Sequence, residues 1–313
     1  MTGVSYVVTV YNKAPYLPAV LGALFGQEGD FAREFILVDD GSTDGSGGLL
    51  DRLCAGRAEA RIIHQANAGL SAATIAGVKA ATLPWLKLVD GDDVLAPYCT
   101  RVLLDAATRA GVKFAYGGWT SFPPGGTFDF SRFDAARAAA RRVEPFGEFL
   151  KNCPVTMSRT LIERAEYWKV GGADPRISTV DHSLLLRLSW RGAAAELDIP
   201  LGATSAIVPG RMSDNVGFML HETNRSIIYF LAETEGLSWR QRYTAVERAF
   251  GRAWKWQHRR VGASIWSRWF WLYALAKLGF TPLAAPYLTQ TLDAFVPARR
   301  GARSNTAPPT KPA

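Results

Sequence analysis

The residues Glu34–Ser46, EFILVDDGSTDGS, give the clearest indication of the fold. Its first seven residues form a short apolar run closed by two aspartates, which is typical of a strand buried on both faces. The remaining glycine, serine, threonine and aspartate residues supply turn and helix-start positions. Leu49, Leu50 and Leu53 then suit one face of a helix. The stretch therefore predicts a strand, a turn and a helix in that order.

The same alternation continues on both sides of this stretch. Apolar strand-like runs and periodic helix-like runs follow one another as strand 4–10, helix from Pro15, strand 61–65, helix 70–81, strand 85–90, helix 97–110 and strand 113–119. Repeated alternation predicts an α/β fold with a mainly parallel twisted sheet and helices on both faces. In such sheets ligands bind beyond the carboxyl ends of the strands.

The pattern changes after Trp119. Residues 121–128 read as a turn-rich loop, and the segment from there to Val143 is rich in arginine and alanine with weak patterning. Residues 146–167 read as a helix and a strand, and residues 180–190 as another helix. From Met212 the pattern is helical and rich in tryptophan. We therefore expect an α/β domain at 1–211, a helical C-terminal extension at 212–300, and a disordered tail at 301–313, which is rich in proline, threonine and basic residues.

Composition narrows the class of protein. The 313 residues include 48% hydrophobic and 20% charged residues, which is ordinary for a globular protein. The three cysteines are far apart and the four histidines are scattered, so neither a disulfide framework nor a histidine-rich zinc site is expected. No secretory signal precedes the first strand, and we expect a cytoplasmic protein.

The net charge of +8 is concentrated near the C-terminus. Between Arg240 and Arg300 there are 11 Lys or Arg residues and 2 Asp or Glu residues, an excess of +9. Such a segment indicates an anionic partner, which could be membrane lipid, nucleic acid or an acidic glycan, unless it is only a solvated basic helix.

Three carboxylates follow the strand at 85–90 within LVDGDD, namely Asp90, Asp92 and Asp93. Like charges this close repel unless a cation compensates them. Carboxylate oxygens suit a hard divalent ion, Mg²⁺ or Mn²⁺, with positions left for phosphate oxygens. The alternative is a turn before the next helix. Asp40 ends the strand at 34–40 and can accept hydrogen bonds from a base or ribose, whereas we interpret Asp44 as a turn residue.

Four strings occur in order: TVYNKAPYL from Thr9, VDDGSTDGS from Val38, NAGLSAA from Asn67 and LVDGDDVLAP from Leu88. Together they resemble the nucleotide-sugar-binding half of glycosyltransferase family 2, which has the GT-A fold. The resemblance is dense over residues 4–119 and thinner to about Asn215. It implies an inverting transferase that moves a sugar from a nucleotide-diphosphate donor, with a UDP-sugar favoured.

The resemblance also implies roles for single residues. Thr9, Tyr11 and Asn12 would line the nucleotide base, Asp40 would meet the uracil edge, and Asn67 and Gly69 would form the loop beneath the nucleotide. Asp90 and Asp92 match the two acids of the family's DxD motif, facing ribose and metal, and Asp93 would assist in metal binding.

The acceptor side is matched less completely. The family's Glu-Asp pair corresponds here to Val180 and Asp181, so Asp181 is the candidate general base, with a helix cap as the alternative and His182 as a rim residue. The family's Arg-Asn corresponds to Ala73 and Thr74, so one phosphate or base contact is missing. Arg211 is the candidate to pair with the diphosphate in place of the family's histidine.

Five of the ten tryptophans lie between Trp254 and Trp271, interleaved with arginine and lysine. This pattern suits a helix lying in the headgroup region of an anionic membrane, and a helical lid is the alternative. We expect peripheral association with the inner face of the plasma membrane, and a glycan or lipid-linked acceptor of lipopolysaccharide or other surface polysaccharide synthesis.

Two other functions remain open from the residues. A nucleotidyltransferase would also use paired aspartates and Mg²⁺, although its first loop would carry more cations than Lys13. A nucleic-acid-binding protein could use the basic tail, but it would leave the acidic clusters unexplained, so no nucleic acid is expected. An oxidoreductase is disfavoured because no GxGxxG follows the first strand.

Overall fold

The computed structural model describes residues 2–208 and 211–296. It divides into two compact units, which are not two consecutive blocks of the chain. Among the described residues, the sheet unit comprises 2–145, Val155–Pro175 and 188–208, and the helical unit comprises Phe146–Pro154, Arg176–Arg187 and 211–296. The predicted disordered tail at 301–313 lies outside the described residues.

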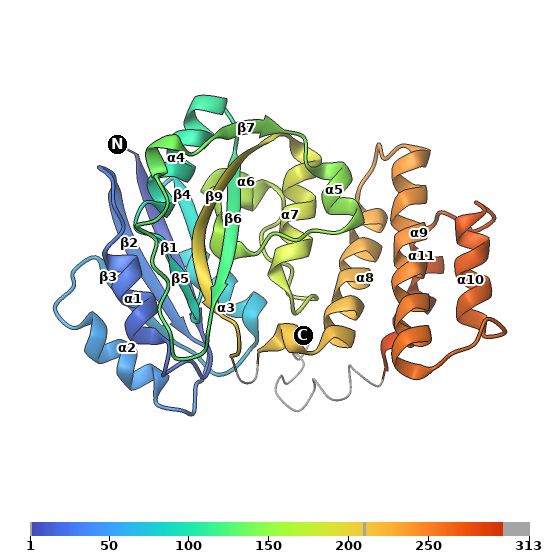
Figure 1. Ribbon diagram of the computed structural model, residues 1–313, viewed down its shortest axis with the longest axis horizontal. Coiled ribbons are helices and arrows are strands. Elements are labelled where there is room, and N and C mark those ends of the chain that lie inside the picture. The colour runs from blue at the N-terminus through green and yellow to red at the C-terminus, as the bar shows by residue number, and fades with distance from the viewer. Residues whose placement is uncertain (1, 209–210, 297–313) are drawn as a thin grey trace. The chain divides into compact units, whose positions relative to one another are not determined.

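The sheet unit contains all nine strands of one mixed sheet (Figure 1). They are β1 (Gly3–Val10), β2 (Ala32–Asp39), β3 (Ala60–His64), β4 (Trp85–Asp90), β5 (Asp93–Leu95), β6 (Phe114–Phe122), β7 (Ala140–Val143), β8 (Thr160–Glu163) and β9 (Ala194–Ser205). Its helices are α1 (Leu17–Phe25), α2 (Ser46–Cys54), α3 (Leu70–Ala80), α4 (Cys99–Ala110) and α6 (Arg164–Lys169).

The strand order is β3-β2-β1-β4-β8-β6-β9-β5, with β7 paired to β9. The first four strands are parallel, as predicted from the alternation. The rest of the sheet is mixed, because β8 lies antiparallel to both β4 and β6. The β1–β2–β4 register brings the carboxyl ends of these strands to one edge, with Thr9 opposite Asp90.

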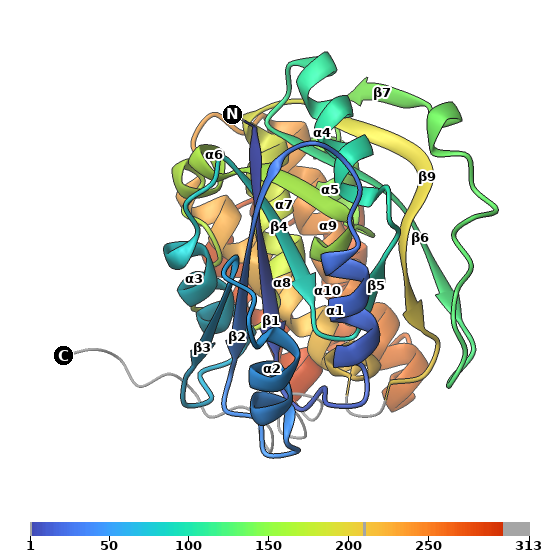
Figure 2. The same ribbon diagram turned by 90° about the vertical axis from the view of Figure 1, so that its left-hand side faces the viewer.

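Side chains of β1 alternate between two packed faces. Tyr6 and Val8 belong to the buried cluster that includes Leu21 of α1 and Leu50 of α2, and Figure 2 shows these helices in front of the sheet. Val7 points to the opposite face, where it meets Gly77 of α3. Helices therefore cover both faces, as the continuous apolar runs predicted.

Gly77 is required by this close approach of α3 to the sheet. A Cβ at position 77 would lie 2.3 Å from Cγ1 of Val7 and 3.1 Å from Cγ2 of Val38. We expect Gly77→Ala to destabilise the protein by about 1–3 kcal/mol, because overpacking forces the core apart. Gly22→Ala is the matched control, since nothing lies within 4 Å of its Cβ position in α1 and alanine favours a helix by about 0.5–1 kcal/mol. Urea unfolding measures the change in stability of both variants. Equal stabilities of the two variants would contradict the close packing of Gly77 against Val7 and Val38.

The sequence interpretation missed strand β9. Residues 194–205 contain Pro200 and Gly202, which ordinarily weaken a strand. Here the pairing of β6 with β9 shifts register on either side of Gly118, the residue opposite Pro200, and this irregularity accommodates the proline. Part of the weakly patterned region after Trp119 is also regular, because β6 extends to Phe122 and β7 pairs with β9.

The helical unit contains α5 (Phe146–Lys151), α8 (Val216–Glu233), α9 (Trp239–Trp256), α10 (Arg268–Lys277) and α11 (Ala285–Leu288). The first part of α7 (Val180–Arg191) also belongs to it. Helix α9 packs against α5, α8 and α10. None of the described helices is both long and apolar enough to cross a membrane.

Candidate active site

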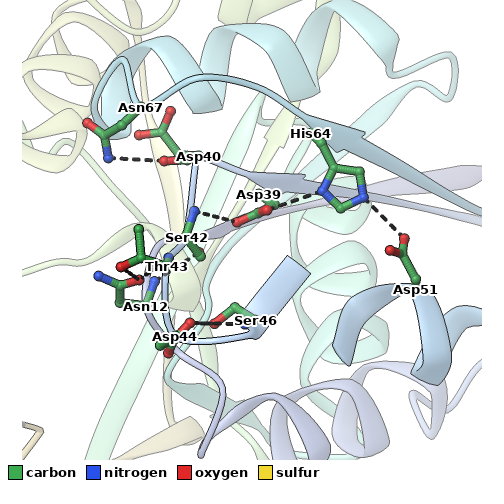
Figure 3. Close-up of polar contacts among 10 residues, drawn as sticks. All are labelled: Asn12, Asp39, Asp40, Ser42, Thr43, Asp44, Ser46, Asp51, His64 and Asn67. Carbon is green, nitrogen blue, oxygen red and sulfur yellow. Dashed lines mark hydrogen bonds and ion pairs between the residues drawn. The ribbon is translucent and has the colours of Figure 1, made fainter. Parts of the chain in front are cut away.

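The loop after β1 is fixed to the loop after β2 by side-chain caps (Figure 3). The N–H of Asn12 donates to Oγ of Ser42 at 3.0 Å, and the N–H of Thr43 donates to Oδ1 of Asn12 at 2.8 Å. Asn12 has a φ of 53°, a left-handed conformation that asparagine tolerates better than most residues. These bonds place Tyr11, which is 36% exposed, at the edge where β1 ends.

Asp44 has the turn role predicted for it. Its Oδ1 accepts hydrogen bonds from the N–H and the hydroxyl of Ser46, and its Oδ2 accepts one from the N–H of Ala14 at 3.0 Å. Partial burial raises the pKa of Asp44, but the hydrogen bonds from Ser46 and Ala14 outweigh it and bring the pKa below its ordinary value. The carboxylate therefore stays ionised and holds the two loops together.

Asp40 is brought together with Asn67 and Gly69. Its two carboxylate oxygens accept hydrogen bonds from the N–H groups of Ala68 and Gly69, both at 2.9 Å, and from Nε2 of Gln65 at 2.7 Å. The side chain of Asn67 donates to the Asp40 carbonyl at 3.0 Å. A carboxylate offers about four lone-pair positions, so three donors leave room for one more.

A row of hydrogen-bonded ionisable groups, which the sequence did not reveal, holds the loop after β2. Asp39 accepts from the N–H of Ser42, and its second oxygen lies 3.1 Å from Nδ1 of His64. Nε2 of His64 lies 3.1 Å from Oδ1 of Asp51. Hydrogen bonds to Asp39 and then to Asp51 raise the pKa of His64. The only sequence signal was the doubled aspartate, because the partners come from three different elements.

The acids after β4 have different partners. Asp92 is buried, and its Oδ2 lies 2.8 Å from Nζ of Lys13. Asp93 is buried opposite Thr204, whose hydroxyl donates to Oδ1 of Asp93 across the β5–β9 pair. Asp90 is half-buried, and its N–H donates to the hydroxyl of Ser158 at 3.0 Å. Helix α4 begins at Cys99 after Tyr98, so none of the three acids caps it.

Two cations lie near these acids. Lys13 contacts Asp92, and Lys87 is fully buried in β4 with its Nζ donating to the carbonyl of Ser158. Burial lowers the pKa of Lys87, while the thiol of Cys99 and the carboxylate of Asp93 oppose the shift. The ion pair of Lys13 with Asp92 therefore partly compensates the repulsion expected from the sequence.

The acids after β4 were predicted to hold a divalent ion together with a substrate phosphate. Within residues 2–208 and 211–296, no three His, Cys, Asp or Glu side chains are grouped so as to bind an ion. Mg²⁺ is commonly held by one or two carboxylates together with substrate phosphates. Asp90 and Asp92 stay the predicted ligands of such a site, whereas the hydrogen bond from Thr204 gives Asp93 a partner within the protein. The predicted metal role of Asp93 stays a prediction.

Asp181 and Arg211 belong to the helical unit, whereas the other candidate residues belong to the sheet unit. Asp181 is half-buried in the first turn of α7, which begins at Val180, so it lies inside the helix and is not its N-cap. Arg211 is half-buried at the start of a short 3₁₀ turn. The interpretation of His182 as a rim residue is wrong, because the side chain is buried and this burial, with Arg252 nearby, lowers its pKa to about 3.

The segment leading to Asp181 is anchored by a buried carboxylate on α8. Oε2 of Glu222 accepts from the N–H of Ser178 at 2.6 Å, and Oε1 lies 3.0 Å from both Nδ1 of His221 and Nη1 of Arg225. Burial raises the pKa of Glu222, but His221 and Arg225 outweigh it and bring the pKa below the ordinary value of 4.5. Glu222 is therefore a positioning residue for the start of α7.

We expect Glu222→Gln to destabilise the protein by about 1–3 kcal/mol at neutral pH, because a buried partner of Arg225 is lost. A lowered folded-state pKa stabilises the fold above the ordinary value of 4.5, and this contribution is lost as the pH falls through the lower value. The difference from wild type should therefore shrink below pH 4.5. Urea unfolding at several pH values measures it, with the exposed Glu233→Gln as the control on the same helix. A pH-independent difference would contradict the ionic role.

A family model and the similar known proteins all indicate the same family. The sequence model described as "Glycosyl transferase family 2" matches residues 5–170. An uncharacterized glycosyltransferase, EpsJ of Bacillus subtilis, is 40% identical over 107 residues, which are 34% of this chain and 30% of EpsJ. A PGL/p-HBAD biosynthesis glycosyltransferase of Mycobacterium bovis is 34% identical over 136 residues, 41% of this chain and 52% of that protein. The matches thus span about a third to a half of these relatives.

Solved structures share the fold over nearly the whole chain. S. aureus TarS 1–349 in complex with UDP-GlcNAc has a TM-score of 0.64 at 14% identity, covering 98% of this chain and 93% of that one. The mannosyltransferase PcManGT from Pyrobaculum calidifontis, in complex with GDP-Man and Mn²⁺, has a TM-score of 0.58 at 16% identity, covering 95% and 86%. The predicted α/β fold of GT-A type with a helical C-terminal region is confirmed.

Proposed function

Because the chain belongs to glycosyl transferase family 2, we propose that it moves a sugar from a nucleotide-diphosphate donor, a UDP-sugar, to a hydroxyl of an acceptor. The observation that carries this proposal is that Asp40, Asp90 and Asp92 lie at or just past the carboxyl ends of β2 and β4, which both pair with β1 in parallel. UDP-GlcNAc bound to TarS supports the choice of donor. Family membership also favours sugar transfer over nucleotidyl transfer and nucleic-acid binding.

The nucleotide would lie against the loops that follow β1 and β2. The Tyr11 ring is available for stacking, and Thr9 and Asn12 flank it on the same loop. The remaining lone-pair position of Asp40 can accept the N–H of a uracil edge. Asn67 and Gly69, held by Asp40, form the floor of this position.

A divalent ion, Mn²⁺ or Mg²⁺, would be held by Asp92 and Asp90, with Asp93 as a further candidate ligand. When bound, it supplies positive charge for the diphosphate leaving group. The Mn²⁺ present with PcManGT supports metal use in this fold. Lys13 contacts Asp92 and supplies a second positive charge at the same carboxylate. Arg211 is the proposed further partner of the diphosphate.

The transfer itself would be a single displacement that inverts the anomeric carbon. The acceptor oxygen forms a bond to that carbon as its bond to the diphosphate oxygen breaks, and the electron pair leaves with the diphosphate. Asp181 takes the hydroxyl proton. Its place in the first turn of α7, which Glu222 anchors, gives this base a fixed backbone.

The acceptor is proposed to be a glycan or lipid-linked molecule of lipopolysaccharide or other surface polysaccharide synthesis. A succinoglycan biosynthesis protein, ExoO of Rhizobium meliloti, is among the relatives, at 31% identity over 112 residues, 36% of this chain and 32% of ExoO. A cytoplasmic enzyme associated with the inner face of the plasma membrane would meet such an acceptor. The basic, Trp-rich segment 212–300 supports that location.

Thermal unfolding with a panel of nucleotides and nucleotide sugars, with and without Mn²⁺, tests the proposal. We expect the largest rise in melting temperature with UDP or a UDP-sugar and Mn²⁺ together, because a ligand that binds only the folded state stabilises it. Stabilisation by oligonucleotides alone, or by no nucleotide in the panel, would contradict the proposed function.

A further inference from the structure

Helix α10, Arg268–Lys277, is apolar around its whole circumference. Its sequence RWFWLYALAK carries charge only at the two ends. Trp269 and Ala276 are buried on one side, and Trp269 packs with Ala253 of α9. A helix that is apolar on all sides is ordinarily buried on all sides. The far side of α10 should therefore be covered by something.

That far side is exposed in the structure. Trp271 is 51% exposed, Leu275 is 42% exposed and Leu278, just past the helix, is 69% exposed. Spacings of four and three residues place these side chains on one stripe of the helix, opposite Trp269 and Ala276. The loops at the two ends add further exposed apolar side chains, so we define the α10 surface as Ile265, Trp266, Trp271, Leu275, Leu278 and Phe280.

The most exposed members of the α10 surface lie at its ends. Trp266 is 79% exposed before the helix, and Phe280 is 75% exposed after it. Figure 1 shows α10 and its two flanking loops on the outer side of α9 within the helical unit. Exposed apolar groups gathered on one element mark an interaction site, whereas single ones scattered over a surface are ordinary.

Charge identifies what would cover this surface. From Arg248 to Leu292 the sequence has seven Lys or Arg residues and no Asp or Glu. Arg259 and Arg260 are exposed in the π-helical turn Gln257–Val261, immediately before the loop that carries Trp266. Two copies of such a segment would repel each other, whereas a layer of anionic headgroups attracts each nearby cation.

We propose that α10 lies in the plane of an anionic lipid bilayer, with the α10 surface at the boundary of headgroups and acyl chains. Arg259 and Arg260 would face the headgroups. The helix is about 15 Å long at about 1.5 Å per residue, and a hydrocarbon core is about 30 Å thick, so α10 lies in the membrane surface and does not cross it. This inference rests on the membrane location proposed above and assigns the residues that make the contact.

Flotation of the full chain with lipid vesicles tests the assignment. We expect binding to phosphatidylcholine vesicles that contain phosphatidylglycerol, and about tenfold weaker binding when Trp266→Ser and Trp271→Ser are combined. Trp168→Ser is the matched control, because Trp168 is 41% exposed in the sheet unit, outside the α10 surface. A second variant, Arg259→Gln with Arg260→Gln, should lose the preference for phosphatidylglycerol while the tryptophans remain.

Equal flotation of wild type and the double tryptophan variant would overturn the inference, as would no binding to anionic vesicles. A dimer of the wild type that dissociates in the tryptophan variant would also overturn it, since a second copy would then cover α10. The stabilisation by UDP and Mn²⁺ is measured on the same proteins in solution. If UDP and Mn²⁺ do not stabilise the protein but vesicle binding is normal, only the proposed function is contradicted. If UDP and Mn²⁺ stabilise the protein but it does not bind vesicles, only the membrane contact is contradicted.

Discussion

Asp92→Asn is expected to reduce sugar transfer about a thousandfold and to remove the Mn²⁺-dependent stabilisation by UDP. A metal that neutralises a developing charge contributes several kcal/mol, and each 1.36 kcal/mol is a factor of ten in rate. Asparagine keeps the shape of the side chain but loses the charge that a divalent ion and Lys13 both require. Transfer rates at saturating donor and thermal unfolding with UDP and Mn²⁺ measure the two effects.

Asp105→Asn is the matched control for this substitution. Asp105 lies in α4 with its side chain 47% exposed and forms an i,i+4 ion pair with Arg109, and solvent-accessible pairs contribute little to stability. We expect wild-type transfer and a wild-type response to UDP and Mn²⁺. If Asp92→Asn behaves like this control, the carboxylate of Asp92 has no role in donor binding.

Asp181→Asn is expected to lower the rate of transfer by about 10²–10⁴ while donor binding is unchanged. A general base contributes a factor of this order, and the amide cannot take the acceptor proton. Binding of UDP and Mn²⁺, measured by calorimetry, should match wild type because Asp181 acts on the acceptor.

Glu233→Gln serves as the comparison for Asp181→Asn, because it neutralises an exposed carboxylate of the same helical unit. Its rate should equal that of wild type. Near wild-type transfer by Asp181→Asn would show that a different residue removes the proton. A parallel loss of UDP binding would show that Asp181 acts on the donor or on folding.

The sequence predicted the first half of the sheet because each of its strands has a recognisable pattern within its own few residues. The strands β1, β2 and β4 are continuous apolar runs, each followed by polar turn residues, and their helices show one apolar stripe. Strand β9 gives no such signal, since it contains a proline and a glycine and is stabilised by pairing with β6, about 80 residues earlier. Long-range pairing of this kind is invisible to a local pattern.

The same distinction applies to the candidate site. The positions of Asp40 and Asp92 at strand ends followed from the pattern, because parallel strands bring their carboxyl ends to one edge. The partners of these acids did not follow from it. Lys13 reaches Asp92 across 79 residues of sequence, and His64 links Asp39 to Asp51 from a third strand. The exposed stripe of α10 also required the structure, because composition alone does not tell a lid from a membrane contact.

Diffraction from a crystal of the protein soaked with UDP and MnCl₂ would show whether Asp90 and Asp92 bind a metal together with the donor. The anomalous signal of manganese should appear beside the carboxylates of Asp90 and Asp92 and next to the diphosphate of UDP. Asp90 and Asp92 turned away from a bound UDP, with no manganese near them, would contradict the account.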